Sequence, residues 1–218
     1  MQLRENGQKS LKKNNINKKF VYLISPNKIK DKKFYINLDK VLSSKKISFF
    51  QLRLKNESNK EKTYIGKKIK KTCKKHRVKF LVNDEPDLAK KLNADGCHIG
   101  QKDMNFKNCK KIIGKNKIIG VTCHNSKKFA LRAKKAGASY VAFGSFFKSN
   151  TKKTTFKANL ETLRWAKKKI SMPIVAIGGI DSSNYKKILL NGADYIACSS
   201  YVWNNKKLNP VLAISKFK

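Results

Sequence analysis

The sequence predicts an α/β fold built as a single (β/α)8 TIM barrel. First, eight short apolar runs alternate with polar segments of helical periodicity over about 200 residues. Second, these runs are apolar throughout, as in parallel strands that are covered on both faces. Third, a turn of Gly, Ala and Asp or Ser recurs before three of the runs, at 94–96, 137–140 and 192–195. A doubly wound open sheet is the competing architecture, and the count of eight strands favours the barrel.

The predicted elements follow one another in regular order along the chain. The strands are the runs at 20–25, 47–54, 80–82, 97–99, 118–123, 140–144, 173–177 and 195–198. Apolar residues at helical spacing predict helices at 33–45, 65–76, 86–92, 126–136, 160–170, 183–189 and 211–217. Ser126 and either Ser182 or Ser183 are the expected N-caps of their helices, and Gly137 is an expected helix end. The segment 145–157 is the longest stretch without predicted structure.

The chain divides into a tail and one domain. Residues 1–19 are polar and rich in Lys and Asn, so we expect a disordered basic tail, followed by the barrel domain at 20–218. No apolar run approaches the ~18 residues that cross a bilayer, and no signal-peptide core is present. Five cysteines without a CxxC pair fit reduced thiols rather than a zinc site. We therefore expect a soluble cytoplasmic protein with no membrane partner.

The formal net charge of +39 raises the question of nucleic-acid binding. The excess is mostly Lys and is spread over nearly every predicted helix, as at Lys67-Lys68, Lys134-Lys135 and Lys167-Lys168-Lys169. A dedicated binding stripe would concentrate the charge and would favour Arg and aromatic residues. We predict no specific nucleic-acid partner, and we keep a polyanion-binding barrel without catalysis as an alternative.

Carboxylates follow two predicted strands that are neighbours in the barrel. Asp84 comes directly after the third strand, and Asp103 lies shortly after the fourth. A helix joins these strands, so they are parallel and end at the same edge, where the active sites of such barrels form. Mg²⁺ usually takes one or two carboxylates together with substrate phosphates, so we predict Mg²⁺ held by Asp84 and Asp103. Asp95 and Asp194 belong to the recurring turn and are excluded.

Other strand ends carry groups that suit anions. Arg53, Lys55 and Lys152 are cations that can bind a negatively charged group. Gly178-Gly179 and Ser199-Ser200 each precede a helix, as in the phosphate cup that follows strands seven and eight of such barrels. We therefore predict two anion sites, one with a metal for a diphosphate and one without a metal for a monophosphate.

These residues also resemble a known family, the thiamine phosphate synthases, over roughly residues 20–203. No single segment decides the resemblance, which depends on the order and spacing of several short segments taken together. The segments are YLIS at 22–25, QLRLK at 51–55, FLVND at 80–84, ADGCHIGQKD at 94–103, IIGVTCH at 118–124, YVAFGSFFKSNTK at 140–152, PIVAIGGI at 173–180 and GADYIACSS at 192–200.

The resemblance implies a TIM-barrel enzyme, with 20–218 as its catalytic domain. It would join 4-amino-2-methyl-5-(diphosphooxymethyl)pyrimidine to a thiazole phosphate, giving thiamine phosphate and pyrophosphate with Mg²⁺ as cofactor. The residues that match the diphosphate site are Gln51, Arg53, Lys55, Asn83 and Lys152, and those that match the metal site are Asp84 and Asp103. The residues that match the thiazole phosphate site are Ser149, Thr151, Gly179, Ser199 and Ser200. Thr122 occupies a position at which the family usually has Ser, and its side chain also carries a hydroxyl.

Departures from the family pattern bear on the loop after the sixth strand. Ser145 and Lys148 replace prolines, Ser149 replaces Thr, and Ser199 replaces an aliphatic residue, which concerns loop stiffness and thiazole affinity more than the chemistry. A thiazole tautomerase-like barrel is an alternative function, with His124 as the proton carrier. The expected partners are the two small-molecule substrates, and a homo-oligomer is compatible with the sequence.

Overall fold

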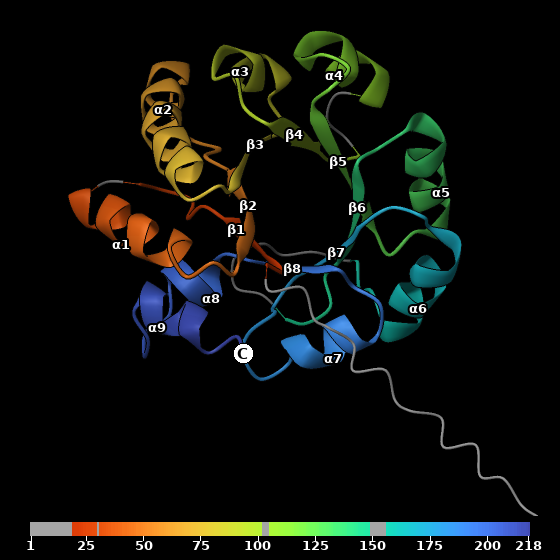
Figure 1. Ribbon diagram of the computed structural model, residues 1–218. Coiled ribbons are helices and arrows are strands. Elements are labelled where there is room, and N and C mark those ends of the chain that lie inside the picture. The colour runs from red at the N-terminus through yellow and green to blue at the C-terminus, as the bar shows by residue number, and fades with distance from the viewer. Residues whose placement is uncertain (1–18, 30, 102–104, 149–155) are drawn as a thin grey trace, which may run out of the picture.

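The chain forms a barrel of parallel strands inside a ring of helices (Figure 1). The computed structural model describes residues 19–29, 31–101, 105–148 and 156–218. The strands are β1 (Val21–Ile24), β2 (Ile47–Leu52), β3 (Lys79–Asn83), β4 (Gly96–Ile99), β5 (Ile118–His124), β6 (Tyr140–Gly144), β7 (Ile174–Ile177) and β8 (Tyr195–Cys198). Consecutive strands pair in parallel, and β8 pairs with β1 to close the barrel. The predicted (β/α)8 fold is confirmed.

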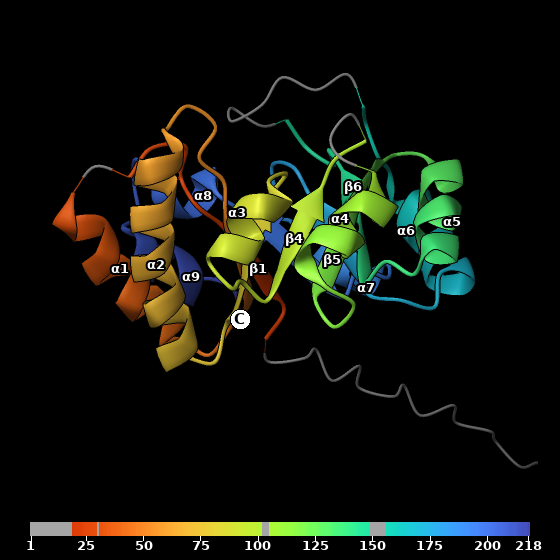
Figure 2. The ribbon, with the colours of Figure 1, turned by 90° about the horizontal axis from the view of Figure 1, so that it is seen from above.

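Helices follow the strands and cover the outside of the barrel. They are α1 (Lys32–Leu42), α2 (Asn59–Lys75), α3 (Pro86–Lys91), α4 (Phe106–Ile113), α5 (Lys127–Ala136), α6 (Leu160–Lys169), α7 (Tyr185–Leu190), α8 (Ser200–Trp203) and α9 (Pro210–Ser215). Figure 2 shows the ring from the side, with α1 and α2 at one end of the view and α5 and α6 at the other. Within the described ranges, every helix is too short or too polar to span a bilayer.

Several predicted helix boundaries need correction. The expected cap of α7 at Ser182 or Ser183 is wrong, because the N-cap is Asn184 and the Asp181 carboxylate accepts hydrogen bonds from the N–H and hydroxyl of Ser183. The helices α4 and α8 have no predicted counterpart. The start of α4 does carry a sequence signal, since the Asn105 side chain caps it by accepting the Asn108 N–H at 2.9 Å. The predicted cap Ser126 and end Gly137 of α5 are confirmed.

The second strand is shorter than predicted. It ends at Leu52 rather than Leu54. The reason is that Ser25 Oγ accepts the N–H of Arg53 at 2.9 Å, so a side chain takes the place of the next ladder bond to β1. Arg53 therefore begins a loop at the C-terminal end of the barrel. The predicted tail at 1–19 lies outside the described residues except for Lys19, whose carbonyl accepts a hydrogen bond from the Ser48 hydroxyl.

The recurring turn has one structural role at all three positions. The Asp or Ser side chain of each turn accepts a hydrogen bond from the N–H of the first or second residue of the strand before it. The backbone N–H of the same Asp or Ser donates to the carbonyl of that strand residue, at 2.8 Å in all three turns. The side-chain bonds join Asp95 to Phe80 at 2.8 Å, Ser139 to Ile119 at 3.0 Å and Asp194 to Ile174 at 2.9 Å. The turns thus bind adjacent strands together at the N-terminal end of the barrel, and Asp95 and Asp194 are turn carboxylates as predicted.

Substituting Asp95 tests this role. Asp95→Ala leaves the buried Phe80 N–H without its acceptor, so we expect a loss of about 1–3 kcal/mol in the free energy of unfolding, measured with urea. Asp95→Asn keeps an acceptor oxygen and loses only the exposed ion pair with Lys79 at 3.2 Å, so its loss should stay below about 1 kcal/mol. Equal losses in the two variants would contradict the assigned role.

Apolar side chains form an outer and an inner layer. The outer layer packs strand residues such as Val21, Leu23 and Phe80 against the helices. The inner layer lies within the barrel and includes Tyr22, Leu81 and Tyr140. The two layers follow the alternation of side chains along each strand.

Candidate active site

The C-terminal ends of β2, β3 and β4 are joined by side-chain hydrogen bonds. Gln51 Nε2 donates to Asn83 Oδ1 at 2.5 Å, and Asn83 Nδ2 donates to Asp84 Oδ2 at 2.5 Å. The other carboxylate oxygen of Asp84 accepts the N–H of Gly100 at 3.3 Å. Gln51 is buried, whereas Asn83 and Asp84 are half-buried. Three predicted site residues, Gln51, Asn83 and Asp84, therefore form one polar row at the predicted edge.

The backbone of Asp84 turns sharply after β3. Its φ is 60°, in the left-handed region that Asn and Asp adopt more readily than other non-glycine residues. Its N–H donates to the carbonyl of His98 at 2.7 Å, which ties it to β4. The other predicted metal ligand, Asp103, lies outside the described residues. Among the described residues, no cluster of three His, Cys, Asp or Glu side chains that could hold a metal ion is present. The carboxylate oxygens of Asp84 are nevertheless of the ligand type that Mg²⁺ prefers.

A second group joins the ends of β8, β1 and β2. Arg53 is held twice near β1, through its N–H to Ser25 Oγ at 2.9 Å and through Nη1 to Asn27 Oδ1 at 3.1 Å. The Ser199 hydroxyl donates to the Ser25 carbonyl at 3.0 Å. Lys55 is exposed. None of the ion pairs in the described ranges involves Arg53 or Lys55, so both charges are available to an anion.

The phosphate cup predicted after β7 has a close contact at Gly179. Gly179 has φ of 65°, and a Cβ added to it would lie 2.5 Å from the Lys148 carbonyl oxygen and 2.7 Å from Phe147 Cβ. The neighbouring Gly178 carbonyl accepts the Phe147 N–H at 2.9 Å. The backbone after β7 therefore lies directly against the start of the β6–α6 loop.

The remaining predicted anion ligands are only partly described. Ser149, Thr151 and Lys152 lie outside the described residues. Ser200 is the first residue of the short helix α8, with Ser199 as its N-cap, and both side chains are half-buried. Gly179, Ser199 and Ser200, which are predicted for the cup, thus lie after the C-terminal ends of β7 and β8.

Thr122 begins a chain of hydrogen bonds inside the barrel, here called the interior chain (Thr122, His98, Tyr140 and Tyr22). Thr122 Oγ1 lies 2.8 Å from His98 Nε2, and His98 Nδ1 lies 2.8 Å from the Tyr140 hydroxyl. The Tyr140 and Tyr22 hydroxyls are 2.8 Å apart. Burial raises the pKa of both tyrosines above the ordinary value, so both keep their protons at neutral pH.

Sequence reasoning identified Thr122 but missed the other members of the interior chain. A usable signal was present, because side chains alternate along a strand. Cys97 and Ile99 belong to the outer core layer, which leaves His98 between them facing the barrel interior. The same alternation applies to Tyr22, between the outer-layer residues Val21 and Leu23.

His124, the proton carrier of the alternative function, has a packing contact. Its ring stacks on Phe156 with centroids 4.1 Å apart and planes 23° apart. Phe156 lies where the β6–α6 loop returns, and its carbonyl accepts the Ser145 N–H at 3.2 Å. This contact supports the structural role that a half-buried histidine at a strand end commonly has.

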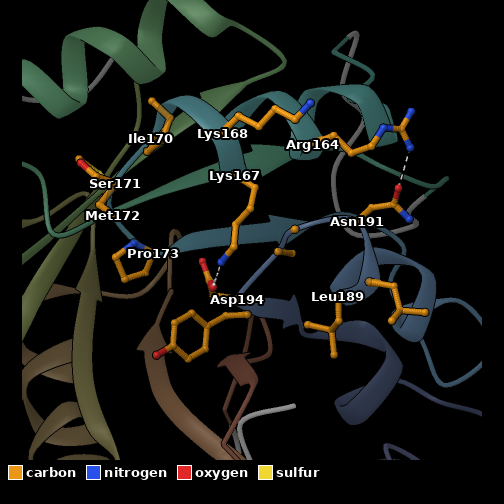
Figure 3. A pocket seen from close by; sticks show the side chains of 14 residues that line it. Arg164, Lys167, Lys168, Ile170, Ser171, Met172, Pro173, Leu189, Asn191 and Asp194 are labelled. Atoms are coloured by element: carbon orange, nitrogen blue, oxygen red, sulfur yellow. Dashed lines mark hydrogen bonds and ion pairs between the residues drawn. The ribbon is translucent and has the colours of Figure 1, made fainter. Parts of the chain in front are cut away.

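An open groove of about 880 Å³ lies away from these residues, at the N-terminal ends of β7 and β8 (Figure 3). Its Asp194 has one carboxylate oxygen on Lys167 at 2.8 Å and the other on the Ile174 N–H at 2.9 Å. Arg164 donates to Asn191 at 2.7 Å across the groove. These groups hold α6, α7 and the recurring turn together. The groove is separate from the candidate active site, because that site lies at the C-terminal ends of the strands.

Comparison with known proteins places the chain in a family. The family model described as "Thiamine monophosphate synthase" matches residues 21–202. "Thiamine-phosphate synthase" of Pelagibacter ubique (strain HTCC1062) is 64% identical over 208 residues, covering 95% of this chain and 100% of that protein. The protein of the same name from Rhodospirillum centenum (strain ATCC 51521 / SW) is 34% identical, covering 90% of this chain and 95% of its own length.

A solved structure shows the same fold. The thiamine phosphate pyrophosphorylase from Pyrococcus furiosus superposes with a TM-score of 0.81 at 31% identity, covering 92% of this chain and 94% of that one. The range matched by the family model includes every described residue of the candidate site, and the two relatives and the solved structure each cover 90% or more of this chain. The chain belongs to the thiamine monophosphate synthase family.

Proposed function

We propose that this chain condenses 4-amino-2-methyl-5-(diphosphooxymethyl)pyrimidine with a thiazole phosphate, releasing pyrophosphate and forming thiamine phosphate. The observation that carries the proposal is the polar row of Gln51, Asn83 and Asp84, which lies at the same barrel end as the cations Arg53 and Lys55. A carboxylate at the same barrel end as two cations that form no ion pair with a described residue suits a metal-bound diphosphate. The named relatives share this activity by name and support the same conclusion.

The metal part of the proposal rests on Asp84. Its carboxylate is oriented by Asn83 on one oxygen and by the Gly100 N–H on the other. Asp84 and Asp103 would hold Mg²⁺, and a bound Mg²⁺ supplies positive charge to the leaving pyrophosphate.

The protein's own groups divide the remaining work. Arg53 and Lys55, with Lys152, bind the diphosphate and stabilise the charge that develops as it departs. Gln51 and Asn83 orient the reactant and the Asp84 carboxylate. The electron-rich aminopyrimidine bears the cation left behind, and the thiazole nitrogen attacks that carbon. No general base is needed in this sequence of steps.

The monophosphate of the thiazole is assigned to the second anion site. Gly179, Ser199 and Ser200 supply backbone and hydroxyl groups at the ends of β7 and β8, and Ser149 and Thr151 complete the predicted set. The loop that carries the last two is anchored at its ends, because the Ala158 N–H donates to the Ser145 carbonyl at 2.9 Å. Closure of this loop would exclude water from the reacting carbon.

Neither alternative function is favoured. A tautomerase-like barrel has no use for the row around Asp84, and the names of the relatives point to the synthase. A polyanion-binding barrel would concentrate its charge in one stripe, whereas the lysines of this chain are spread over nearly every helix. A cytoplasmic location remains part of the proposal and is supported by the five cysteines, all unpaired and buried, as is usual in a reducing compartment.

A direct assay tests the function. Purified protein with both substrates and Mg²⁺ should release pyrophosphate and thiamine phosphate in equal amounts, and omitting either substrate should abolish the signal. Chelating the metal with EDTA should lower the rate at least about 10²-fold, and added Mg²⁺ should restore it. Folded protein that releases no pyrophosphate, or whose rate ignores EDTA, would contradict the proposal. Conversion of an isomeric thiazole phosphate without the diphosphate would favour the tautomerase instead.

A further inference from the structure

The direction of the interior chain follows from its buried end. The hydroxyl of Tyr22 is inside the barrel, with the residue 2% exposed, and within the described residues its only hydrogen-bond partner is the Tyr140 hydroxyl. Its proton must therefore point to Tyr140, because the opposite direction would bury a donor without an acceptor. The oxygen of Tyr140 is then an acceptor toward Tyr22, and its own proton is used elsewhere.

The next two bonds follow from the first. Tyr140 donates its proton to His98 Nδ1, 2.8 Å away, so this nitrogen carries no hydrogen in the neutral imidazole. The hydrogen of His98 is then on Nε2, which donates to Thr122 Oγ1 at 2.8 Å. The Thr122 oxygen is thereby an acceptor toward His98, and the Thr122 hydroxyl proton is left for a different acceptor.

Packing holds this arrangement in place. Tyr140 on β6 reaches His98 on β4 by passing over Gly120 of β5, where an added Cβ would lie 1.8 Å from Tyr140 Cζ. The ring of Tyr140 also stacks on His98 with planes 18° apart. Only glycine at position 120 leaves this route open, so the contact between Tyr140 and His98 is built into the barrel.

We infer that Tyr140 is a positioning residue: it keeps the proton of neutral His98 on Nε2, so that the Thr122 hydroxyl donates its hydrogen to an acceptor atom of a bound reactant. The part that concerns the reactant rests on the proposed function, whereas the direction of the hydrogen bonds does not. Thr122 lies near the C-terminal end of β5, and Gln101, in the segment that leads to Asp103, donates to its carbonyl. Thr122 is therefore at the same barrel end as Asp84, which directly follows β3.

Nitrogen NMR of the unliganded full chain tests the hydrogen-bond direction. The sequence has only three histidines, His76, His98 and His124, so protein labelled with ¹⁵N-histidine gives few signals, which His76→Gln and His124→Gln assign. At about pH 8, where an unperturbed imidazole is neutral, His98 should show its hydrogen on Nε2. A hydrogen on Nδ1 in the wild-type protein would overturn the inference without any variant.

Variants separate the positioning role from packing. Tyr140→Phe should shift His98 toward a mixture of both tautomers and lower kcat by about 5–10-fold. Thr122→Val should leave the tautomer unchanged, because Tyr140 still donates to Nδ1, yet lower activity by a similar factor or more. A matched control is Tyr195→Phe, another tyrosine packed in the inner layer and not part of the interior chain, which should change neither. An unchanged tautomer in folded Tyr140→Phe would overturn the role of Tyr140.

The kinetics of Thr122 identify the reactant. Thr122→Ser keeps the hydroxyl and should retain activity, whereas Thr122→Val should raise the KM of the substrate whose acceptor atom it contacts, or lower kcat if that bond forms during reaction. Wild-type-like kinetics for Thr122→Val would overturn the donor role. If the NMR result holds but the wild-type protein makes no thiamine phosphate, the proposed function fails and the hydrogen-bond direction stands.

Discussion

Replacing Asp84 with alanine is expected to lower kcat for pyrophosphate release by about 10²–10³-fold, the usual loss on removing one contact that stabilises a transition state. Asp84 is the described carboxylate of the row that joins β2, β3 and β4, and its two oxygens are oriented by Asn83 and the Gly100 N–H. Its removal would take a negative ligand from the proposed Mg²⁺ site and would remove the hydrogen-bond acceptor of Asn83 Nδ2. Steady-state kinetics at saturating Mg²⁺ would measure the effect.

The backbone at this position shapes the choice of variants. Asp84 has φ of 60°, a conformation that asparagine adopts readily and that costs alanine about 1 kcal/mol. Asp84→Asn therefore keeps the turn and one acceptor oxygen while removing the charge. We expect it to lose nearly as much activity as Asp84→Ala, with a weaker apparent affinity for Mg²⁺ and a free energy of unfolding close to that of the wild type.

A nearby carboxylate provides the control for charge alone. Asp87 is exposed in the first turn of α3, three positions after Asp84. Asp87→Asn makes the same change in net charge and should leave kcat and the Mg²⁺ dependence within about twofold of the wild type, because an exposed charge contributes little through solvent. Activity of Asp84→Asn within tenfold of the wild type would contradict the assignment of Asp84.

The fold was predictable because each strand carries a local signal. Runs without polar residues, such as those of β6 and β8, can only be covered on both faces, and the recurring turn fixes where three strands begin. Asp95 shows why that turn could be separated from the site in advance: it precedes a strand, and active-site groups follow strands. The same rule selected Asn83 and Asp84, which the structure joins by a hydrogen bond at the C-terminal end of β3.

The connections within the site were less accessible to sequence reasoning. Ser25 and Asn27 can bind Arg53 only because the C-terminal ends of β1 and β2 lie side by side in the barrel. No local sequence pattern predicts this contact. The contact of Tyr22 with Tyr140 joins strands that are not neighbours, β1 and β6, across the barrel interior. Asp103, Ser149, Thr151 and Lys152 lie outside the described residues, so their roles stay predictions.

Gly179→Ala should lower kcat/KM for the thiazole phosphate by about 10²-fold or more. An alanine Cβ would lie 2.5 Å from the Lys148 carbonyl oxygen and 2.7 Å from Phe147 Cβ, and the carbonyl oxygen belongs to the backbone and cannot rotate away. The start of the β6–α6 loop would have to move by about 1 Å, a displacement that can cost about 10²-fold in rate. The proposed monophosphate site includes both Gly179 and this loop, so the loss should be greatest for that substrate.

Backbone strain by itself does not account for the expected loss, and Gly137 allows the two effects to be separated. Gly137 has φ of 83°, so alanine there suffers a comparable conformational penalty, but a Cβ would meet no atom within 4 Å. Gly137→Ala should therefore lower the free energy of unfolding by about 1 kcal/mol and leave kcat/KM unchanged. If both variants lost stability and neither lost activity, the contact of Gly179 with the loop would be irrelevant to catalysis. A selective loss in Gly179→Ala would instead locate the second anion site where β7 meets the loop, apart from the polar row at Asp84 that is proposed to hold Mg²⁺.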